Sequence, residues 1–226
     1  REQFAEVAMS GRQNALNHPD AIMRKPMTLE DYFKAPILAD PLCLFDFCLE
    51  TDGAIAMVVT STEQANDLRQ PPVKIVACAH GGHRDWGRSL YWMNMPEDAF
   101  VSSGNVAIAN RLYKDADVTP ADIDVAQIYD HFTPMVLAQL EDFGFCERGE
   151  GGPFVESGAI RFEGGSLPIN TDGGQLSGGY VWGMTHVREA VAQIRGLAVN
   201  QVQSCDLALV TGGPSSLPVS GLILGK

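Results

Sequence analysis

Residues 170–184 read NTDGGQLSGGYVWGM, and this stretch decides how the rest of the chain is interpreted. It holds two glycine pairs, Gly173 with Gly174 and Gly178 with Gly179, shortly before a helical pattern at residues 187–196. Because glycine has no Cβ, such pairs let the backbone approach a ligand or a packed chain closely. Neither pair has the spacing of a dinucleotide fingerprint or a P-loop. An ordinary turn is the alternative for any single pair, whereas clustering before a helix favours a ligand-binding loop.

Outward from this loop, the apolar pattern predicts strands that alternate with helices. The predicted helices cover residues 4–17, 28–33, 61–70, 99–113, 134–145 and 187–196, and the predicted strands cover residues 54–60, 73–80, 123–129, 206–213 and 220–225. This alternation predicts an α/β fold with a largely buried sheet. A change of composition near Pro72 gives two predicted domains, residues 1–72 and 73–226. Residues 81–98 mix glycine, aromatic and charged residues without a period and predict a long loop of the kind that is often functional.

The charge and hydropathy of the chain exclude several classes of function. A formal net charge of -12 argues against nucleic-acid binding, because a duplex would be repelled. No run approaches the roughly 18 apolar residues that a membrane-spanning helix needs, and no signal-peptide pattern opens the chain. We therefore expect a cytoplasmic protein. Since the sequence starts at Arg1, within a helical pattern and without Met, we also expect a fragment of a longer protein.

The cysteines and histidines suggest no metal or disulfide chemistry. The five cysteines form no CxxC pair, which makes structural zinc and a disulfide framework poor interpretations and favours small buried hydrophobic residues. No HExxH spacing is present, so no metal site is predicted. We expect His18 at the surface and His186 in a structural role. His131 follows a predicted strand end, where active-site lining and hydrogen-bonded core are both open.

Two segments, in the same order as in the family, resemble signatures of the thiolase superfamily in its sterol-carrier or lipid-transfer-like branch. The sequence NTDGGQLSGGYVWGM resembles the motif N-x-x-GG-x-x-x-x-GHP-x-G, with Tyr180 at the position of the catalytic histidine. The sequence QIYDHFTP resembles the NEAF or HDCF motif, with Tyr129 at the Asn or His position and with Asp130 and Phe132 matching the acid and the aromatic.

Two further segments extend the resemblance along nearly the whole chain. The sequence DLALVTGGP resembles the closing CxGG strand of the family, with Val210 at the cysteine position. The sequence ADPLCLFDFCLETDGAIAMVVTS resembles the DGA strand that ends the N-terminal half. The resemblance implies a thiolase-like fold, layered α-β-α-β-α, of which the end of the N-terminal half and the complete C-terminal half are present. It also implies that the stretch with the nucleophilic cysteine is missing and that the protein is a homodimer.

The departures from the motifs change the implied chemistry. Thiolysis needs a base and a second acid/base, and the aligned positions hold Tyr180 and Val210. Valine transfers no proton, whereas tyrosine can act as acid or base. Retro-aldol cleavage of a bulky, steroid side-chain type β-hydroxyacyl-CoA requires only an acid and a base. The chain is similar in this respect to bacterial lipid-transfer-like homologues that cleave steroid side-chain CoA esters with a small OB-fold partner.

The resemblance therefore implies a site without a covalently bound cofactor, whose substrate is a coenzyme A thioester. Tyr129 and Tyr180 are the predicted catalytic acid/base pair. The surrounding loops are predicted to contribute Asp130, His131, Gly173, Gly174, Gly178, Gly179, Gly212 and Gly213. Backbone amides of the glycine loop could polarise the thioester oxygen. A thiolase-type acetyl-CoA acyltransferase and a non-catalytic lipid-binding subunit are the alternatives.

Overall fold

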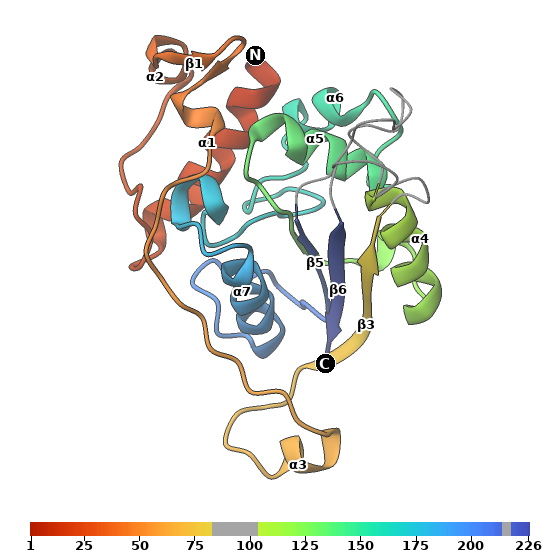
Figure 1. Ribbon diagram of the computed structural model, residues 1–226. Helices are drawn as coiled ribbons and strands as arrows, with labels where there is room; N and C mark the ends of the chain where they lie inside the picture. The colour runs from red at the N-terminus through yellow and green to blue at the C-terminus, as the bar shows by residue number, and fades with distance from the viewer. Residues whose placement is uncertain (83–103, 214–217) are drawn as a thin grey trace.

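A four-stranded sheet forms the centre of the molecule. The computed structural model describes residues 1–82, 104–213 and 218–226. The sheet has the order β3-β6-β5-β4, formed by Lys74–Gly81, Val219–Gly225, Leu207–Gly212 and Val125–Gln127 (Figure 1). β4 runs parallel to β5, and the other two pairs are antiparallel. The predicted α/β class is therefore confirmed, and the structure shows that its sheet is mixed.

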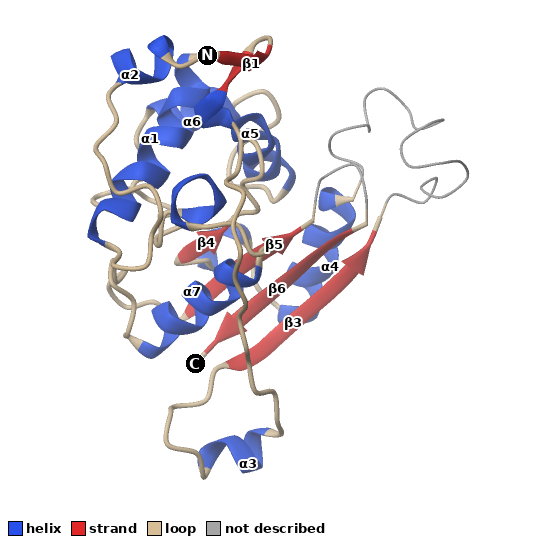
Figure 2. Cartoon of the chain, turned by 60° about the vertical axis from the view of Figure 1, so that its left-hand side comes forward, coloured by secondary structure: helices blue, strands red, loops and turns tan. Residues whose placement is uncertain are grey.

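Helices cover both faces of this sheet, because its strands carry apolar residues on both sides. α4 (Asn105–Ala116) and α5 (Thr133–Asp142) pack on one face, and α7 (Met184–Arg195) packs on the other (Figure 2). Successive strand residues alternate between the two cores: Ala126, Leu209 and Ile223 face α4 and α5, whereas Val125, Ala208, Val210 and Leu224 face α7. Burial on both faces is what a continuous apolar strand indicates.

The N-terminal part of the chain lies against the glycine-rich part. α1 (Glu2–Asn17) contacts α5, α6 (Gly151–Glu156) and the π-helical turn η4 (Gly174–Gly178). After α1 come α2 (Leu29–Lys34), the two-stranded ribbon of β1 (Ile37–Ala39) and β2 (Leu42–Cys43), and the 3-10 turn η1 (Leu44–Asp46). Thr28 and Asp31 form a capping box at the start of α2. The domain boundary near Pro72 stays a prediction.

The predicted strand over residues 54–60 is wrong. These residues form no strand, and Val58 and Val59 are 87% and 77% exposed. A continuous apolar run indicates a buried strand only where a neighbouring strand accepts its backbone hydrogen bonds. Within the described residues no strand pairs with this segment, which instead passes α7 as an extended connection to α3 (Thr62–Asn66) (Figure 2).

Other expectations differ in detail. The strand expected to reach Tyr129 ends at Gln127, and the helix expected over residues 61–70 ends at Asn66. Residues 149–179, which lack a period, contain α6 and η4. The predicted long loop lies almost entirely outside the described residues, as does the start of the helix expected from residue 99. Within the described part of the chain, no helix combines the length and the hydropathy needed to cross a membrane.

The structure also corrects two expectations about burial. His18 is only 6% exposed, because it lies against the side chain of Arg188, with Nε2 at 3.4 Å from Nη2. The five cysteines are all free, but they are not uniformly buried: Cys43 and Cys205 are buried, and Cys78 on the edge strand β3 is exposed. Ala77 and Ala79 pack in the core with α4, so Cys78 between them points to the opposite face of β3, where it is exposed.

Candidate active site

Tyr129 and Tyr180, 51 residues apart in the sequence, meet at the end of the sheet. Their hydroxyl oxygens are 3.0 Å apart, at hydrogen-bonding distance, and the two rings meet edge to face with centroids 6.4 Å apart. Tyr129 is 2% exposed, whereas Tyr180 is partly exposed. The pair therefore presents one buried and one accessible phenol along a single hydrogen bond.

Tyr129 lies just beyond the end of β4, where two side chains hold its backbone in place of a neighbouring strand. Its N–H donates to Thr211 Oγ1 (2.8 Å), and its carbonyl accepts from Gln139 Nε2 of α5 (2.8 Å). Thr211 Oγ1 in turn donates to Gln139 Oε1 (2.6 Å). The closed set of bonds satisfies every polar group involved and holds Tyr129 in one position.

The loop that carries Tyr180 is attached to the same strand end by Asn170. Asn170 has a positive φ of 46°, and its side chain accepts from Ile128 N (2.7 Å) and donates to Ile128 O (3.0 Å). The amide side chain thus takes the place of a neighbouring strand. At the other end of the loop, Tyr180 N–H donates to Thr51 Oγ1 (3.1 Å).

Asp130 connects three elements immediately behind the tyrosine pair. Its carboxylate accepts from the backbone N–H of Gln175 (2.9 and 3.0 Å) and of Leu176 (3.2 Å), both in η4. It also lies 3.1 Å from Nε2 of His186 in α7, although the atoms lack hydrogen-bond alignment. Gly174 must be glycine here, because it has a φ of +60° and its Cβ would lie 2.2 Å from Asp130 Oδ2.

The predicted use of the loop amides as donors to a thioester oxygen is wrong. Each backbone N–H from residue 173 to residue 180 already donates within the protein. Asp130 accepts two of them, and carbonyls within the loop accept four, including Gly173 O, which binds two N–H groups. The glycines therefore serve the packing of the loop.

The chain matches the thiolase C-terminal domain-like family over residues 88–224. It belongs to this family. Its fold is also similar to a solved thiolase relative, a monomeric SCP2-thiolase like protein type 1 from Mycobacterium smegmatis, with a TM-score of 0.65, 16% identity, and coverage of 99% of this chain and 46% of that one. The thiolase-like fold expected from the motifs is thus confirmed.

Three more similar relatives are named as lyases or aldolases. The chain is 44% identical to the 17-hydroxy-3-oxo-4-pregnene-20-carboxyl-CoA lyase of Mycobacterium tuberculosis, over 98% of this chain and 57% of the relative. It is 42% identical to the steroid side-chain-cleaving aldolase of Thermomonospora curvata, over 99% and 56%. The solved Ltp2-ChsH2(DUF35) aldolase is similar with a TM-score of 0.89 and 41% identity, over 99% and 58%. The chain spans somewhat more than half of each relative.

In this thiolase-like chain, the position aligned with the second family cysteine lies in the core. Val210 is buried against Ala190 and Ile194 of α7, so its side chain faces away from solvent. The neighbouring Thr211, rather than residue 210, supports the site. Of the predicted loop glycines, Gly212 ends β5 and Gly213 follows with a φ of +89°. Their predicted place in the site stays a prediction.

Burial shifts the pKa values of Tyr129, Cys48 and His131 in the direction that favours their neutral forms. It raises the pKa of Tyr129, and the hydrogen bond with Tyr180 raises it further. Burial also raises the pKa of the Cys48 thiol, with a smaller contribution from Asp130, and it lowers the pKa of His131. Tyr129 therefore holds its proton firmly, and Cys48 is a protonated thiol rather than a nucleophile.

A second buried network supports the loop from below. Glu189 of α7 accepts from Thr171 Oγ1 (2.6 Å) and from Gln193 Nε2 (3.2 Å), and Asn200 Nδ2 donates to Thr171 O (2.6 Å). Burial raises the pKa of Glu189 to about 7, and the charge of Asp172 adds to the shift. This carboxyl group therefore titrates near neutral pH inside the protein.

Several supporting residues carry no signal in the sequence. Gln139, Thr51 and Gln175 are single polar residues in otherwise ordinary patterns. Only the fold places Gln139 and Thr51 against the backbones of the two tyrosines, and Gln175 against the backbone of Gly183. Thr211 has a weak signal, since it precedes a glycine pair at a strand end. A cleft of about 400 Å³ between α1 and residues 161–163 includes neither tyrosine. Among the described residues, no cluster of His, Cys, Asp and Glu is arranged to hold a metal ion.

Proposed function

We propose that the protein cleaves the Cα–Cβ bond of a bulky β-hydroxyacyl-CoA, of the steroid side-chain type, by a retro-aldol reaction. The observation that carries the proposal is the 3.0 Å contact between the hydroxyl oxygens of Tyr129 and Tyr180. Two linked phenols can remove one proton and deliver another, which is all that this reaction requires. The names of the similar aldolase and lyase support the same class of substrate.

The proposed reaction leaves the tyrosine pair unchanged after each turnover. The β-hydroxyl group gives its proton to one phenolic oxygen, this phenol passes its own proton along the hydrogen bond to the other phenol, and the second phenol protonates Cα. The C–O bond becomes a carbonyl, and the electron pair of the broken Cα–Cβ bond forms the thioester enolate and then the new Cα–H bond. Each tyrosine loses one proton and gains one. The products are a carbonyl compound and a shortened acyl-CoA.

The environments of the two phenols favour different roles. The raised pKa of the buried Tyr129 suits the member of the pair that holds a proton and donates it to the enolate. Tyr180 is more accessible and is the proposed contact with the β-hydroxyl group. A thiolase-type acyltransferase is disfavoured, because the cysteine position is taken by the buried Val210.

The comparison with the Ltp2-ChsH2(DUF35) aldolase supports a partner subunit for this protein as well. We propose that a small OB-fold, acyl-CoA-associated protein is this partner, that the thiolase-like chain forms a homodimer, and that the complex acts in the cytoplasm. The substrate is the acyl-CoA thioester itself, and the proposed mechanism involves no covalently bound cofactor.

The test uses the full-length protein together with its partner. A bulky β-hydroxyacyl-CoA is compared with the corresponding β-ketoacyl-CoA plus free CoA, and cleavage is followed by chromatography of the CoA products. Tyr129→Phe and Tyr180→Phe should each lower kcat by about 10²–10⁴-fold, the usual contribution of an acid or base. Tyr113→Phe is the matched control, since its hydroxyl bonds to Phe143 O in another part of the fold.

Three outcomes would contradict the proposal. Cleavage of the keto substrate alone would assign thiolase chemistry. Full activity of Tyr129→Phe or Tyr180→Phe would remove that tyrosine from its role. Binding of acyl-CoA without cleavage of either substrate would favour the lipid-binding alternative.

A further inference from the structure

The side chain of Trp182 stands in solvent beside the tyrosine pair. It is 79% exposed, which is unusual for so large an apolar group, and its ring lies 5.7 Å from the ring of Tyr180 at an interplanar angle of 33°. An exposed indole next to a polar group offers a flat apolar face beside the tyrosine pair.

The backbone at Trp182 argues that this exposure is not accidental. Its φ is +48°, in the left-handed region that bulky residues avoid and that Gly or Asn occupies at low cost. The fold therefore accepts strain at this position in order to keep a large aromatic side chain there. Strain of this kind, next to a reactive group, indicates that the side chain has a function.

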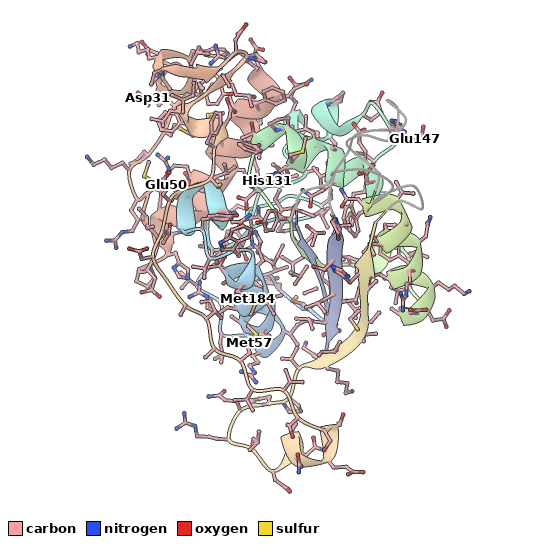
Figure 3. The ribbon with its side chains drawn as sticks, viewed as in Figure 1. Asp31, Glu50, Met57, His131, Glu147 and Met184 are labelled. Atoms are coloured by element: carbon pink, nitrogen blue, oxygen red, sulfur yellow. The ribbon has the colours of Figure 1, made fainter. Side chains whose placement is uncertain are left out.

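Other exposed apolar side chains lie on the two segments beside Trp182. Met184, at the first turn of α7, is exposed, and so is Met57 in the 51–60 segment (Figure 3). The two segments touch next to Trp182, because a Cβ on Gly53 would lie 2.9 Å from Val181 Cγ2.

We propose that Trp182 determines substrate specificity by stacking against the apolar, ring-containing part of the acyl group. A flat ring system lying on the indole would place its attached carbons beside the Tyr180 hydroxyl, which is where the bond must break. This inference rests on the proposed function and adds the residue that selects bulky, flat acyl groups. Straight or short acyl chains would leave most of the indole uncovered and would gain little from it.

The test compares Trp182→Ala, Trp182→Phe and the wild type in the full-length protein with its partner. Trp182→Ala should weaken binding of a polycyclic acyl-CoA about 10–100-fold, with a similar loss in kcat/KM, because most of the apolar contact is removed. The affinity for free CoA should stay within about twofold, since the indole would contact only the acyl part. Trp182→Phe should restore most of the loss. Leu197→Ala, another exposed apolar position, is the matched control.

The alternative is that Trp182 contacts another protein subunit instead of the acyl group. The same variants distinguish these two possibilities. If Trp182→Ala dissociates the partner or the homodimer in sedimentation experiments while the polycyclic acyl-CoA still binds normally, the inference is wrong. Equal losses of acyl-CoA and CoA binding, or no loss at all, would also overturn it. Failure of the wild type to cleave β-hydroxyacyl-CoA would instead refute the proposed function, whereas normal cleavage by Trp182→Ala would refute this inference alone.

Discussion

Replacing Asp130 with asparagine tests whether one carboxylate holds the two tyrosine-bearing segments together. The side chain is buried and accepts the backbone N–H groups of Gln175 and Leu176. It follows Tyr129 directly, and its partners lie in the turn that leads to Tyr180. Asparagine has nearly the same shape, so the change removes charge and one acceptor without opening a cavity.

The magnitude follows from the charge that asparagine lacks. Asp130 Oδ2 accepts from the N–H groups of both Gln175 and Leu176, and Oδ1 accepts only from Gln175, so an amide oxygen in the place of Oδ2 keeps one bond to each. Both of these bonds lose charge assistance worth roughly 1 kcal/mol each, and the NH₂ group in the place of Oδ1 faces the Gln175 N–H without accepting from it. We therefore expect a loss of about 2–3 kcal/mol in the free energy of unfolding of the part that contains this loop.

The assay is urea denaturation of the full-length protein, followed by far-UV circular dichroism at constant pH and salt. Asp52→Asn is the matched control, because it removes the same charge from an exposed residue close to the same loop. Ordinary surface substitutions change the free energy of unfolding by about 0.5 kcal/mol or less. If the free energies of unfolding of Asp130→Asn and the control differ by no more than this, Asp130 does not hold the two segments together. We also expect kcat to fall at least tenfold, since Tyr129 is positioned next to the lost bonds.

Two further predictions concern residues that support the same loop. Folding raises the pKa of Glu189 from 4.5 to about 7, so between these pH values the folded protein keeps a proton that the unfolded chain loses. The free energy of unfolding should therefore fall by on the order of 3 kcal/mol as the pH rises from about 4.5 to about 7. Glu189→Gln should flatten this slope in thermal melts, and an unchanged slope would contradict the assignment. Gly183→Ala should lower kcat at least tenfold, because its Cβ would lie 3.0 Å from the ring of Tyr129. Gly196→Ala, also at positive φ but with no atom within 4 Å of a Cβ, should cost only stability, and equal kcat values for the two variants would argue against the ring contact.

Local patterns in the sequence determined the fold class and most of its elements. Burial on both faces makes the strands at residues 206–213 and 220–225 continuously apolar, so their pattern could be recognised without tertiary information. The same pattern failed at residues 54–60, because an apolar run does not reveal whether a neighbouring strand is present to pair with it. The motif resemblance, in turn, selected Tyr129 and Tyr180 as candidates before any distance was known.

Only the tertiary structure decided how the residues of the candidate site are arranged. The 3.0 Å contact between Tyr129 and Tyr180 joins residues on two separate loops, and the carboxylate of Asp130 fixes their relative position. The glycine pairs by themselves suggested that the loop amides are free to bind a ligand. The folded loop shows that these amides already donate hydrogen bonds within the protein. The physical reason is that hydrogen bonding and burial depend on which groups meet in space, whereas a sequence pattern records only the order of residues along the chain.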